Sequence, residues 1–153
     1  MRLMLGFVLL AICVGIGHVL SLKFTYRKKF FNDFNCFNDK LKNELMYTLN
    51  SIKRIIMQLN FDGDFFSLIK SYFETNNSVN QLTYLSNEEK EFFTDYVNNI
   101  GKGDIESQKV YVDNVKIKLN KYCENAISDE SRYKKLYIKL GFLIGLIALI
   151  IML

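Results

Sequence analysis

Hydrophobic and polar positions divide this chain into three parts. Residues 3–22 and 140–153 carry no charged side chain, whereas all 16 acidic residues and 19 of the 20 basic residues lie between Lys23 and Lys139. At 1.5 Å per residue, a helix over the first stretch reaches about 30 Å, the thickness of the hydrocarbon core of a bilayer. The pattern therefore predicts a transmembrane helix at each end of the chain and a polar body between them.

Each apolar stretch has an alternative interpretation. The first could be a cleaved signal peptide, but the apolar part of a signal is usually about 7–15 residues long and ends at small residues. Here it is longer, and "VLSL" is a poor cleavage site. The second could be a core helix covered by a soluble partner. As a span it is short, unless it starts near Leu136 and Lys139 extends its ammonium group into the headgroups.

Basic residues flank the inner ends of both apolar stretches and predict the orientation. They are Lys23, Arg27, Lys28, Lys29, Arg132, Lys134, Lys135 and Lys139, and Arg2 alone lies on the outer side. The positive-inside rule places the middle of the chain in the cytoplasm. A basic residue near an anionic surface is worth about 1 kcal/mol, so membrane lipid is the expected partner. No aromatic-basic module of the RNA-binding kind accompanies them, so nucleic acid is not expected.

Small residues recur within both apolar stretches. Gly141 and Gly145 are four residues apart, and Gly17 is four residues from Cys13 and from Ser21. Small residues at this spacing let helix backbones approach closely in lipid. We expect Gly17, Gly141 and Gly145 to pack the two anchors on each other or on a partner helix.

The polar middle predicts about four helices. Apolar residues recur every three or four positions from Phe34 to Leu59, which indicates one long amphipathic helix. Asp62-Gly63 ends it, and a shorter helix is expected over 65–75. Ser86 and Glu89 form the capping box of a third helix, which ends before Gly101.

The last predicted helix begins at Asp104, its N-cap. Its seam positions alternate by four and three residues and are Gln108, Val112, Val115, Leu119, Tyr122, Ala126, Asp129, Tyr133 and Leu136. The seam reaches the tail without a breaker. We therefore expect an all-α protein, a membrane-anchored antiparallel helical bundle with N- and C-terminal transmembrane helices: 3–22, a cytoplasmic bundle over 23–139, and 140–153.

No catalytic pattern emerges. His18 is the only histidine and lies inside the first apolar stretch, where it is either a functional residue or a neutral imidazole near the interface. Cys13, Cys36 and Cys123 lack metal-ligand spacing and are expected to be free thiols. Neither a nucleophile triad nor a phosphate-binding loop is present. We expect a protein that is not an enzyme and needs no cofactor or metal.

Three stretches resemble the stage III sporulation protein AB family: "LSNEEKEFF" from Leu85, "IGKGDIESQ" over 100–108, and "SRYKKLYIKLGFLIGLIALIIML" over 131–153. The resemblance includes a junction formed by Ile100, Gly101, Asp104 and Gln108 and a lysine-bearing helix that continues into an apolar tail. It extends to the size and the N-terminal anchor, whereas 30–80 matches only in helical character.

The resemblance implies a non-enzymatic platform subunit of a sporulation-specific, secretion-like channel complex. The soluble part of the family is similar to the cytoplasmic domain of the type II secretion inner-membrane platform protein. The implied partners are a secretion-type ATPase of the stage III sporulation protein AA type and other membrane subunits of the channel. The implied location is the mother-cell side of the outer forespore membrane.

Two functions follow from these observations. In the first, the bundle docks the ATPase; Gly101, Asp104 and Gln108 are expected to be structural, with docking as a second role. In the alternative, the chain is a two-anchor membrane tether or regulator, unrelated to sporulation, that pairs through its long C-terminal seam helix.

Overall fold

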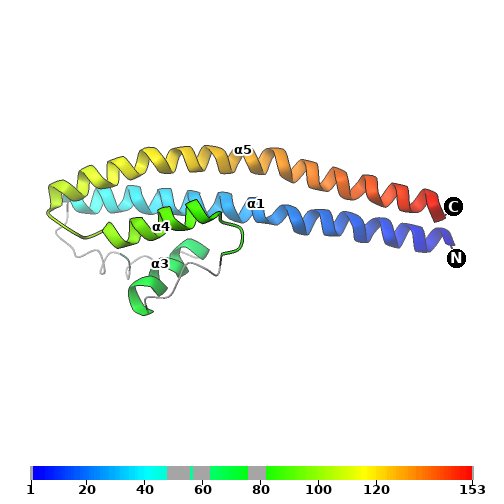
Figure 1. Cartoon of the computed structure of the whole chain (residues 1–153), viewed down its shortest axis with the longest axis horizontal. Coiled ribbons are helices and arrows are strands. Elements are labelled where there is room, and N and C mark those ends of the chain that lie inside the picture. Colours follow the sequence, from blue (N-terminus) through cyan, green and yellow to red (C-terminus); the bar gives the residue numbers. More distant parts are fainter. Residues whose placement is uncertain (1, 48–55, 57–62, 76–81, 153) are drawn as a thin grey trace. The chain divides into compact units, whose positions relative to one another are not determined.

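A computed structural model describes residues 2–47, 56, 63–75 and 82–152 of the chain. Every element among them is an α-helix: α1 (Arg2–Tyr47), α3 (Asp64–Thr75), α4 (Asn87–Asn99) and α5 (Ile105–Met152) (Figure 1). No strand occurs in this described part of the chain. The all-α class expected from the sequence is confirmed.

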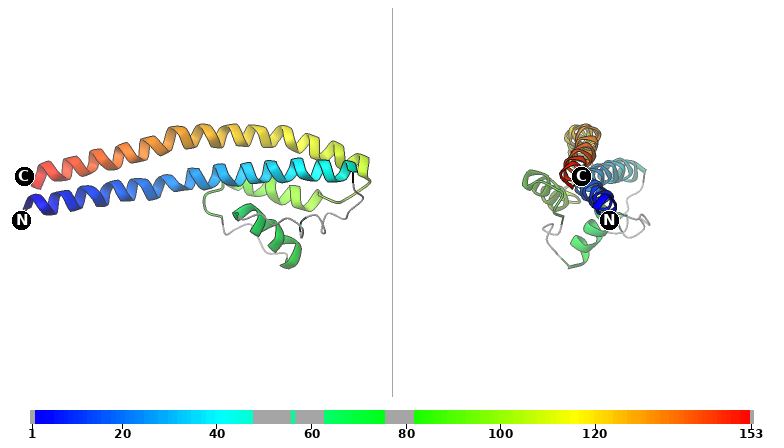
Figure 2. Two further views of the ribbon diagram at one scale, coloured as in Figure 1. Left: turned by 180° about the vertical axis from the view of Figure 1, so that it is seen from behind. Right: turned by 90° about the vertical axis from the view of Figure 1, so that its right-hand side faces the viewer.

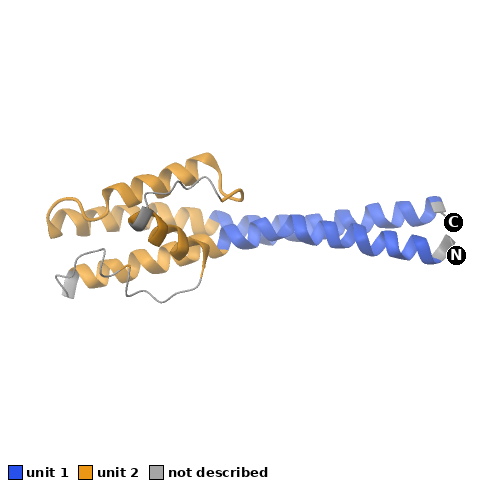
Figure 3. Cartoon of the chain, turned by 90° about the horizontal axis from the view of Figure 1, so that it is seen from below, with its two compact units in different colours: residues 1–28, 125–153 blue, residues 29–124 orange. Residues whose placement is uncertain are grey.

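The chain forms two compact units. Unit 1 contains Met1–Lys28 and Asn125–Leu153, and unit 2 contains Lys29–Glu124 (Figure 3). Unit 1 therefore consists of the first part of α1 and the last part of α5. Within it, α1 begins and α5 ends side by side (Figure 2). Unit 2 contains the rest of these two helices together with α3 and α4.

The predicted anchor and the predicted amphipathic helix are one continuous helix, α1. No glycine lies between His18 and Tyr47 and the chain has no proline, so no residue in this stretch interrupts the hydrogen-bond ladder. The amphipathic pattern continues to Leu59, but 48–55 and 57–62 lie outside the described residues, as do Asp62 and the polar loop expected over 76–81. Within that region, Ile56 is described and is buried.

An aromatic core holds unit 2 together. Its fully buried rings are Phe30, Phe31, Phe34, Phe37, Phe65, Phe93 and Tyr96. The Phe34 ring centroid lies 4.9 Å from that of Phe65 in α3 and 4.7 Å from that of Tyr96 in α4. Aromatic pairs at such separations add about 0.5–1.5 kcal/mol each beyond the area they bury. Phe34 thus joins α1 to both short helices.

α1 and α5 also pack on each other in unit 2, and they run in opposite directions. Phe31 stacks on Tyr122 at 5.2 Å between ring centroids. Farther along α1, the Asn38 side chain donates a hydrogen bond of 3.1 Å to the carbonyl oxygen of Val112. The residue numbers of the partners fall along α5 as they rise along α1.

The seam of α5 is confirmed at its first positions and wrong at its last. Gln108, Val112, Val115, Leu119 and Ala126 are buried. Leu136, however, is 47% exposed. In unit 1 the residue that faces α1 is Tyr137, whose ring lies 5.8 Å from that of Phe24. From Tyr133 onward the contacting residues recur every four positions, so the heptad spacing does not continue into the tail.

Both predicted ends of α4 are confirmed. The Ser86 hydroxyl accepts a hydrogen bond from the backbone N–H of Glu89, and the Glu89 carboxylate accepts one from the backbone N–H of Ser86. Glu89 is itself buried. Just past the other end, Gly101 has φ +83°, a conformation that favours glycine.

We predict that Phe34→Ala lowers the local free energy of unfolding of α3 and α4 by about 3–5 kcal/mol, since it leaves a cavity at the centre of the aromatic core. Amide hydrogen exchange on the full chain in neutral detergent micelles measures this. Asn32→Ala, at an exposed position of the same helix, is the control and should stay within about 0.5 kcal/mol. Equal effects of the two substitutions would contradict the central role of Phe34.

Candidate functional site

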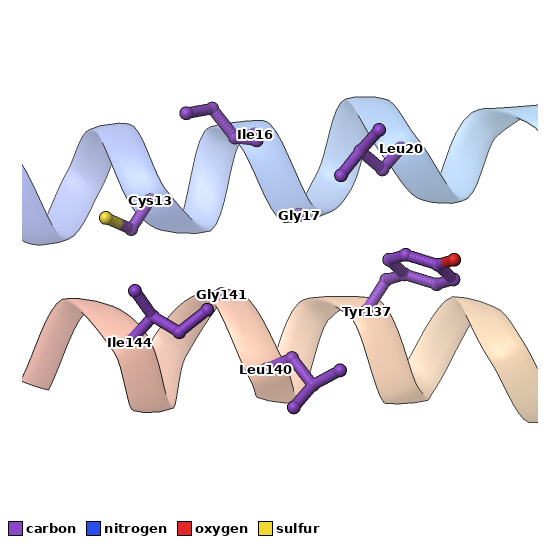
Figure 4. A pocket seen from close by; sticks show the side chains of 8 residues that line it. All are labelled: Cys13, Ile16, Gly17, Leu20, Tyr137, Leu140, Gly141 and Ile144. Carbon is purple, nitrogen blue, oxygen red and sulfur yellow. The ribbon is translucent and has the colours of Figure 1, made fainter.

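The two helices of unit 1 meet at their glycines. A Cβ atom on Gly17 would lie 2.6 Å from the carbonyl oxygen of Tyr137, and one on Gly141 would lie 2.7 Å from that of Cys13. At Gly145 the added atom would lie 3.0 Å from the Cα of Leu10. Figure 4 shows Gly17 and Gly141 on the facing sides of the two helices. The structure thus brings Gly17 and Gly141 together, whereas Gly145 faces Leu10, and the two backbones lie close to each other at all three glycines.

An apolar groove of about 280 Å³ lies beside these glycines (Figure 4). Besides Gly17 and Gly141, its walls come from Cys13, Ile16, Leu20, Tyr137, Leu140 and Ile144. The groove offers no hydrogen-bond donor or acceptor set for a polar ligand. We regard it as part of the packing surface of the helix pair.

A polar network joins the two helices of unit 1 just beyond the apolar stretch. Arg27 pairs with Asp129 at 2.5 Å, and Lys28 pairs with Glu130 at 2.8 Å. Glu130 also accepts a hydrogen bond of 3.0 Å from the Thr25 hydroxyl and lies 3.6 Å from the Lys134 ammonium. The hydrogen bond from Lys28 is the main cause that holds the pKa of the Glu130 carboxyl below its ordinary value.

The eight basic residues predicted for the membrane interface therefore have different surroundings. Arg27, Lys28 and Lys134 form ion pairs within unit 1. Four others of this unit are exposed and form no ion pair among the described residues: Lys23, Arg132, Lys135 and Lys139. The Lys23 ammonium lies 5.0 Å from the ring centroid of Phe24, and the Arg132 guanidinium 5.8 Å from that of Tyr133. Lys29 belongs to unit 2 and is exposed as well.

The charges of the two units differ strongly. Unit 1 holds 8 basic and 2 acidic residues, a net charge of +6, whereas unit 2 holds 12 basic and 14 acidic residues, a net charge of −2. These sum to the +4 of the whole chain. The positive charge of the protein is thus concentrated in the unit that contains both apolar stretches.

His18 lies within the apolar part of α1 and its side chain is exposed. Its backbone carbonyl oxygen accepts a hydrogen bond of 2.6 Å from the hydroxyl of Ser21, which is buried. No described residue forms a hydrogen bond with the imidazole. Among the residues described, no group of histidine, cysteine or acidic side chains is placed to hold a metal ion. Cys13, Cys36 and Cys123 are free thiols.

The predicted junction residues form the corner between α4 and α5. The buried Gln108 side chain accepts a hydrogen bond of 2.9 Å from the backbone N–H of Gly101 and donates to the carbonyl oxygens of Asn99 and Lys102. Asp104 accepts hydrogen bonds at the start of α5, and the bond from the Ser107 side chain is the main reason that its pKa is lowered. Gln108 is therefore a capping residue for α4, which its seam position did not reveal.

One helix among the described residues, Met4–Leu45, is long and apolar enough to cross a membrane, with a mean hydropathy of 2.4 over its apolar window. Only 17% of that window is buried, whereas the core helix of a soluble protein is mostly buried. An N-terminal signal sequence passes the same test of length and composition. The second span, over 140–153, stays a prediction.

These features define an all-helical protein that contains one helix with the length and hydropathy of a membrane span. The chain matches the family described as Stage III sporulation protein AB over residues 2–153, and it belongs to that family. It is therefore a sporulation-related protein, of a family that is not known for enzymes. No curated protein and no solved structure matches it.

We predict that Gly141→Leu destabilises the helix pair of unit 1 by about 1–3 kcal/mol, because the new side chain meets the backbone of α1. Thermal unfolding of the full chain in neutral detergent, followed by circular dichroism, measures the change. Gly15→Leu provides a matched control, since nothing lies within 4 Å of a Cβ at Gly15. A larger effect at Gly15 than at Gly141 would refute the glycine contact.

We also predict a pH dependence that comes from Glu130. A carboxyl whose pKa is lowered in the folded state adds stability above the ordinary glutamate pKa of about 4.3, and this stability is lost as the pH falls through the lower, folded value. Glu130→Gln should therefore flatten the fall in melting temperature between about pH 5 and pH 3. Glu124→Gln, at an exposed position, should leave the slope unchanged. If the melting temperature of Glu130→Gln falls with pH as steeply as that of the unchanged protein, Glu130 is not the source of the pH dependence.

Proposed function

We propose that the protein is a non-enzymatic membrane platform whose helical body lies in the cytoplasm between two transmembrane helices. The observation that carries this proposal is the apolar surface of unit 1. Exposed aliphatic and aromatic side chains cover both of its helices, among them Phe7, Val8, Ile12, Ile16, Leu143, Ile147 and Ile151. Such a contiguous surface needs a cover, and the chain itself offers none among its described residues. A lipid bilayer supplies it.

The architecture we propose is an antiparallel helical bundle, 23–139, held between the spans 3–22 and 140–153. The charge distribution supports a cytoplasmic body. Unpaired Lys23, Lys135 and Lys139 flank the apolar stretches on their inner side, where the anionic leaflet attracts basic side chains. The net charge of −2 on unit 2 gives it no general affinity for that surface.

Within sporulation, the role we propose is that of a platform subunit of a secretion-like channel complex that docks a secretion-type ATPase through the helical body. The proposal draws on membership of the family and on the all-helical body of unit 2. The other membrane subunits of the channel would contact unit 1. The location we propose is the mother-cell side of the outer forespore membrane.

The alternative, a tether that pairs through the seam of its last helix, has little structural support. Val112, Val115 and Leu119 are buried inside unit 2. They are therefore not available to a second coiled coil unless unit 2 opens. A role unrelated to sporulation also disagrees with membership of the family.

We predict that Cys36 reports the orientation directly. It is exposed in unit 2, whereas Cys123 is buried and Cys13 lies in the apolar stretch. In cells that express the full chain, a membrane-impermeant maleimide should label Cys36 only after permeabilisation, and Cys36→Ser should abolish that labelling. A cysteine introduced before Leu3, outside the proposed span 3–22, should be labelled in intact cells. Labelling of Cys36 from outside would reverse the orientation and remove ATPase docking with it.

The platform role is tested separately from the orientation. The full chain, solubilised in neutral detergent from sporulating cells, should co-purify with the secretion-type ATPase. Deletion of the gene should stop spore development after engulfment. Normal spores from the deletion strain would overturn the proposal.

A further inference from the structure

A second apolar groove, of about 450 Å³, lies on unit 1 and shares no residue with the groove in Figure 4. Its walls come from Val14 of α1 and from Ile138, Lys139, Phe142 and Leu143 of α5. All of these side chains except that of the lysine are aliphatic or aromatic. The groove thus combines an apolar wall with a single positive charge.

The contact at Gly141 fixes the depth of Lys139. A Cβ atom on Gly141 would lie 2.7 Å from the carbonyl oxygen of Cys13, so these two residues are at one level. The helices run in opposite directions, so a step of two residues back along α5 to Lys139 matches a step of two residues forward along α1 to Gly15. Gly15 precedes Lys23 by eight residues, which is about 12 Å along a helix. Lys139 therefore lies well inside the proposed first span.

A charged side chain at this depth needs an anionic partner. An unpaired charge within the hydrocarbon region is unfavourable, so such side chains pair with an opposite charge or extend to the interface. Lys139 is exposed and forms no ion pair among the described residues. The same holds for Lys135, which lies one turn earlier on the same face of α5. Two lysines at one edge of the groove are thus available to an anion.

The order of polar and apolar parts along this surface indicates which anion fits. Side chains on a helix tilt toward its N-terminus, so the stem of Lys139 extends along α5 toward Lys135. Phe142 and Leu143 lie on the other side of Lys139, nearer the C-terminus. In the proposed orientation, this order matches a phospholipid of the inner leaflet, whose headgroup lies at the basic end of unit 1. An inorganic anion would neutralise the lysines but leave the groove uncovered.

We propose that this groove holds one anionic phospholipid. Its phosphate accepts hydrogen bonds from the ammonium groups of Lys139 and Lys135, and one acyl chain lies against Val14, Phe142 and Leu143. A phosphatidylcholine carries its own cation beside the phosphate, so the lysines favour an anionic lipid over it. The site rests on the membrane insertion proposed above and adds to it a lipid of defined charge at a defined place.

A single introduced tryptophan can report on the groove, since the chain contains none. Phe142→Trp places the indole in the groove wall. Ile12→Trp, at nearly the same depth, places it on an exposed side of α1 that lines neither groove. Each full-length variant is reconstituted into vesicles of dioleoylphosphatidylcholine with a minor fraction of lipid whose brominated acyl chains quench indole fluorescence on contact.

The two reporters should respond differently to the charge of the brominated lipid. At Phe142→Trp, brominated phosphatidylglycerol should bind at least about fivefold more tightly than brominated phosphatidylcholine, the preference that one basic residue gives near an anionic surface. At Ile12→Trp, the two lipids should quench equally. A preference of the same size at both positions, or none at Phe142→Trp, would overturn the site.

Variants of the lysine test its role in the Phe142→Trp chain. Lys139→Gln should lower the preference for phosphatidylglycerol about fivefold, whereas Lys139→Arg should retain it. Lys23→Gln makes the same change in charge beside the other groove, where the Lys23 ammonium lies 5.5 Å from the ring centroid of Tyr137, and should leave the preference unchanged. A loss for Lys23→Gln or Lys139→Arg as large as for Lys139→Gln would contradict the proposal.

Free phosphate and failed insertion give separate results. Glycerophosphoglycerol, the headgroup without acyl chains, should not relieve the quenching when it is added to the water phase. Relief would show that the lysines bind a free anion and that the groove has no part in binding. If brominated lipids quench neither reporter, the chain is not inserted, and the proposed membrane role fails together with the site. If both lipids quench both reporters equally, membrane insertion stands and the lipid site alone is overturned.

Discussion

The two long helices of unit 1 approach each other most closely where side chains are absent. Because backbone meets backbone at Gly17, Gly141 and Gly145, the larger apolar residues of both helices point away from the contact and form the outer surface. That surface is mostly aliphatic, with Phe7, Phe142 and His18 among its exposed residues. The same glycines that bring the helices together therefore place the apolar side chains on the outside of the pair, and this packing supports the proposed membrane insertion as much as the hydropathy does.

The same geometry determines which basic residues are paired within the protein and which are not. Once the helices are in register, Asp129 and Glu130 lie opposite Arg27 and Lys28, so these four charges are paired within the protein. Such half-exposed pairs contribute little to stability individually, but they define which residues of the two helices face each other. The other lysines of unit 1 form no ion pair among the described residues apart from Lys134, and they are the ones that the proposed membrane contact would use. A count of positive charge in the sequence overstates how much of it can bind lipid.

Much of the fold could be predicted because it depends on interactions between residues that are close in the sequence. The capping box at Ser86, the turn glycine Gly101 and the buried faces at Phe34 and Phe93 all depend on neighbours within one or two helical turns. What could not be predicted depends on the pairing of distant segments. The sequence of one helix does not indicate the hydrogen bond from Asn38 to Val112 or the partners of Glu130. The burial of Phe30 and Phe31 was not predicted because they directly follow a run of basic residues.

The side chain of Gln108 restrains the angle at the corner between α4 and α5. Gly101 and Gly103, both with positive φ, would by themselves allow free rotation about this turn. The carboxamide of Gln108 spans the turn from the first helical turn of α5, so a change in the angle between the two helices would break its hydrogen bonds to Asn99, Gly101 and Lys102. A change of angle at this corner thus has a free-energy cost that two glycines alone would not impose, and the carboxamide of one side chain supplies it.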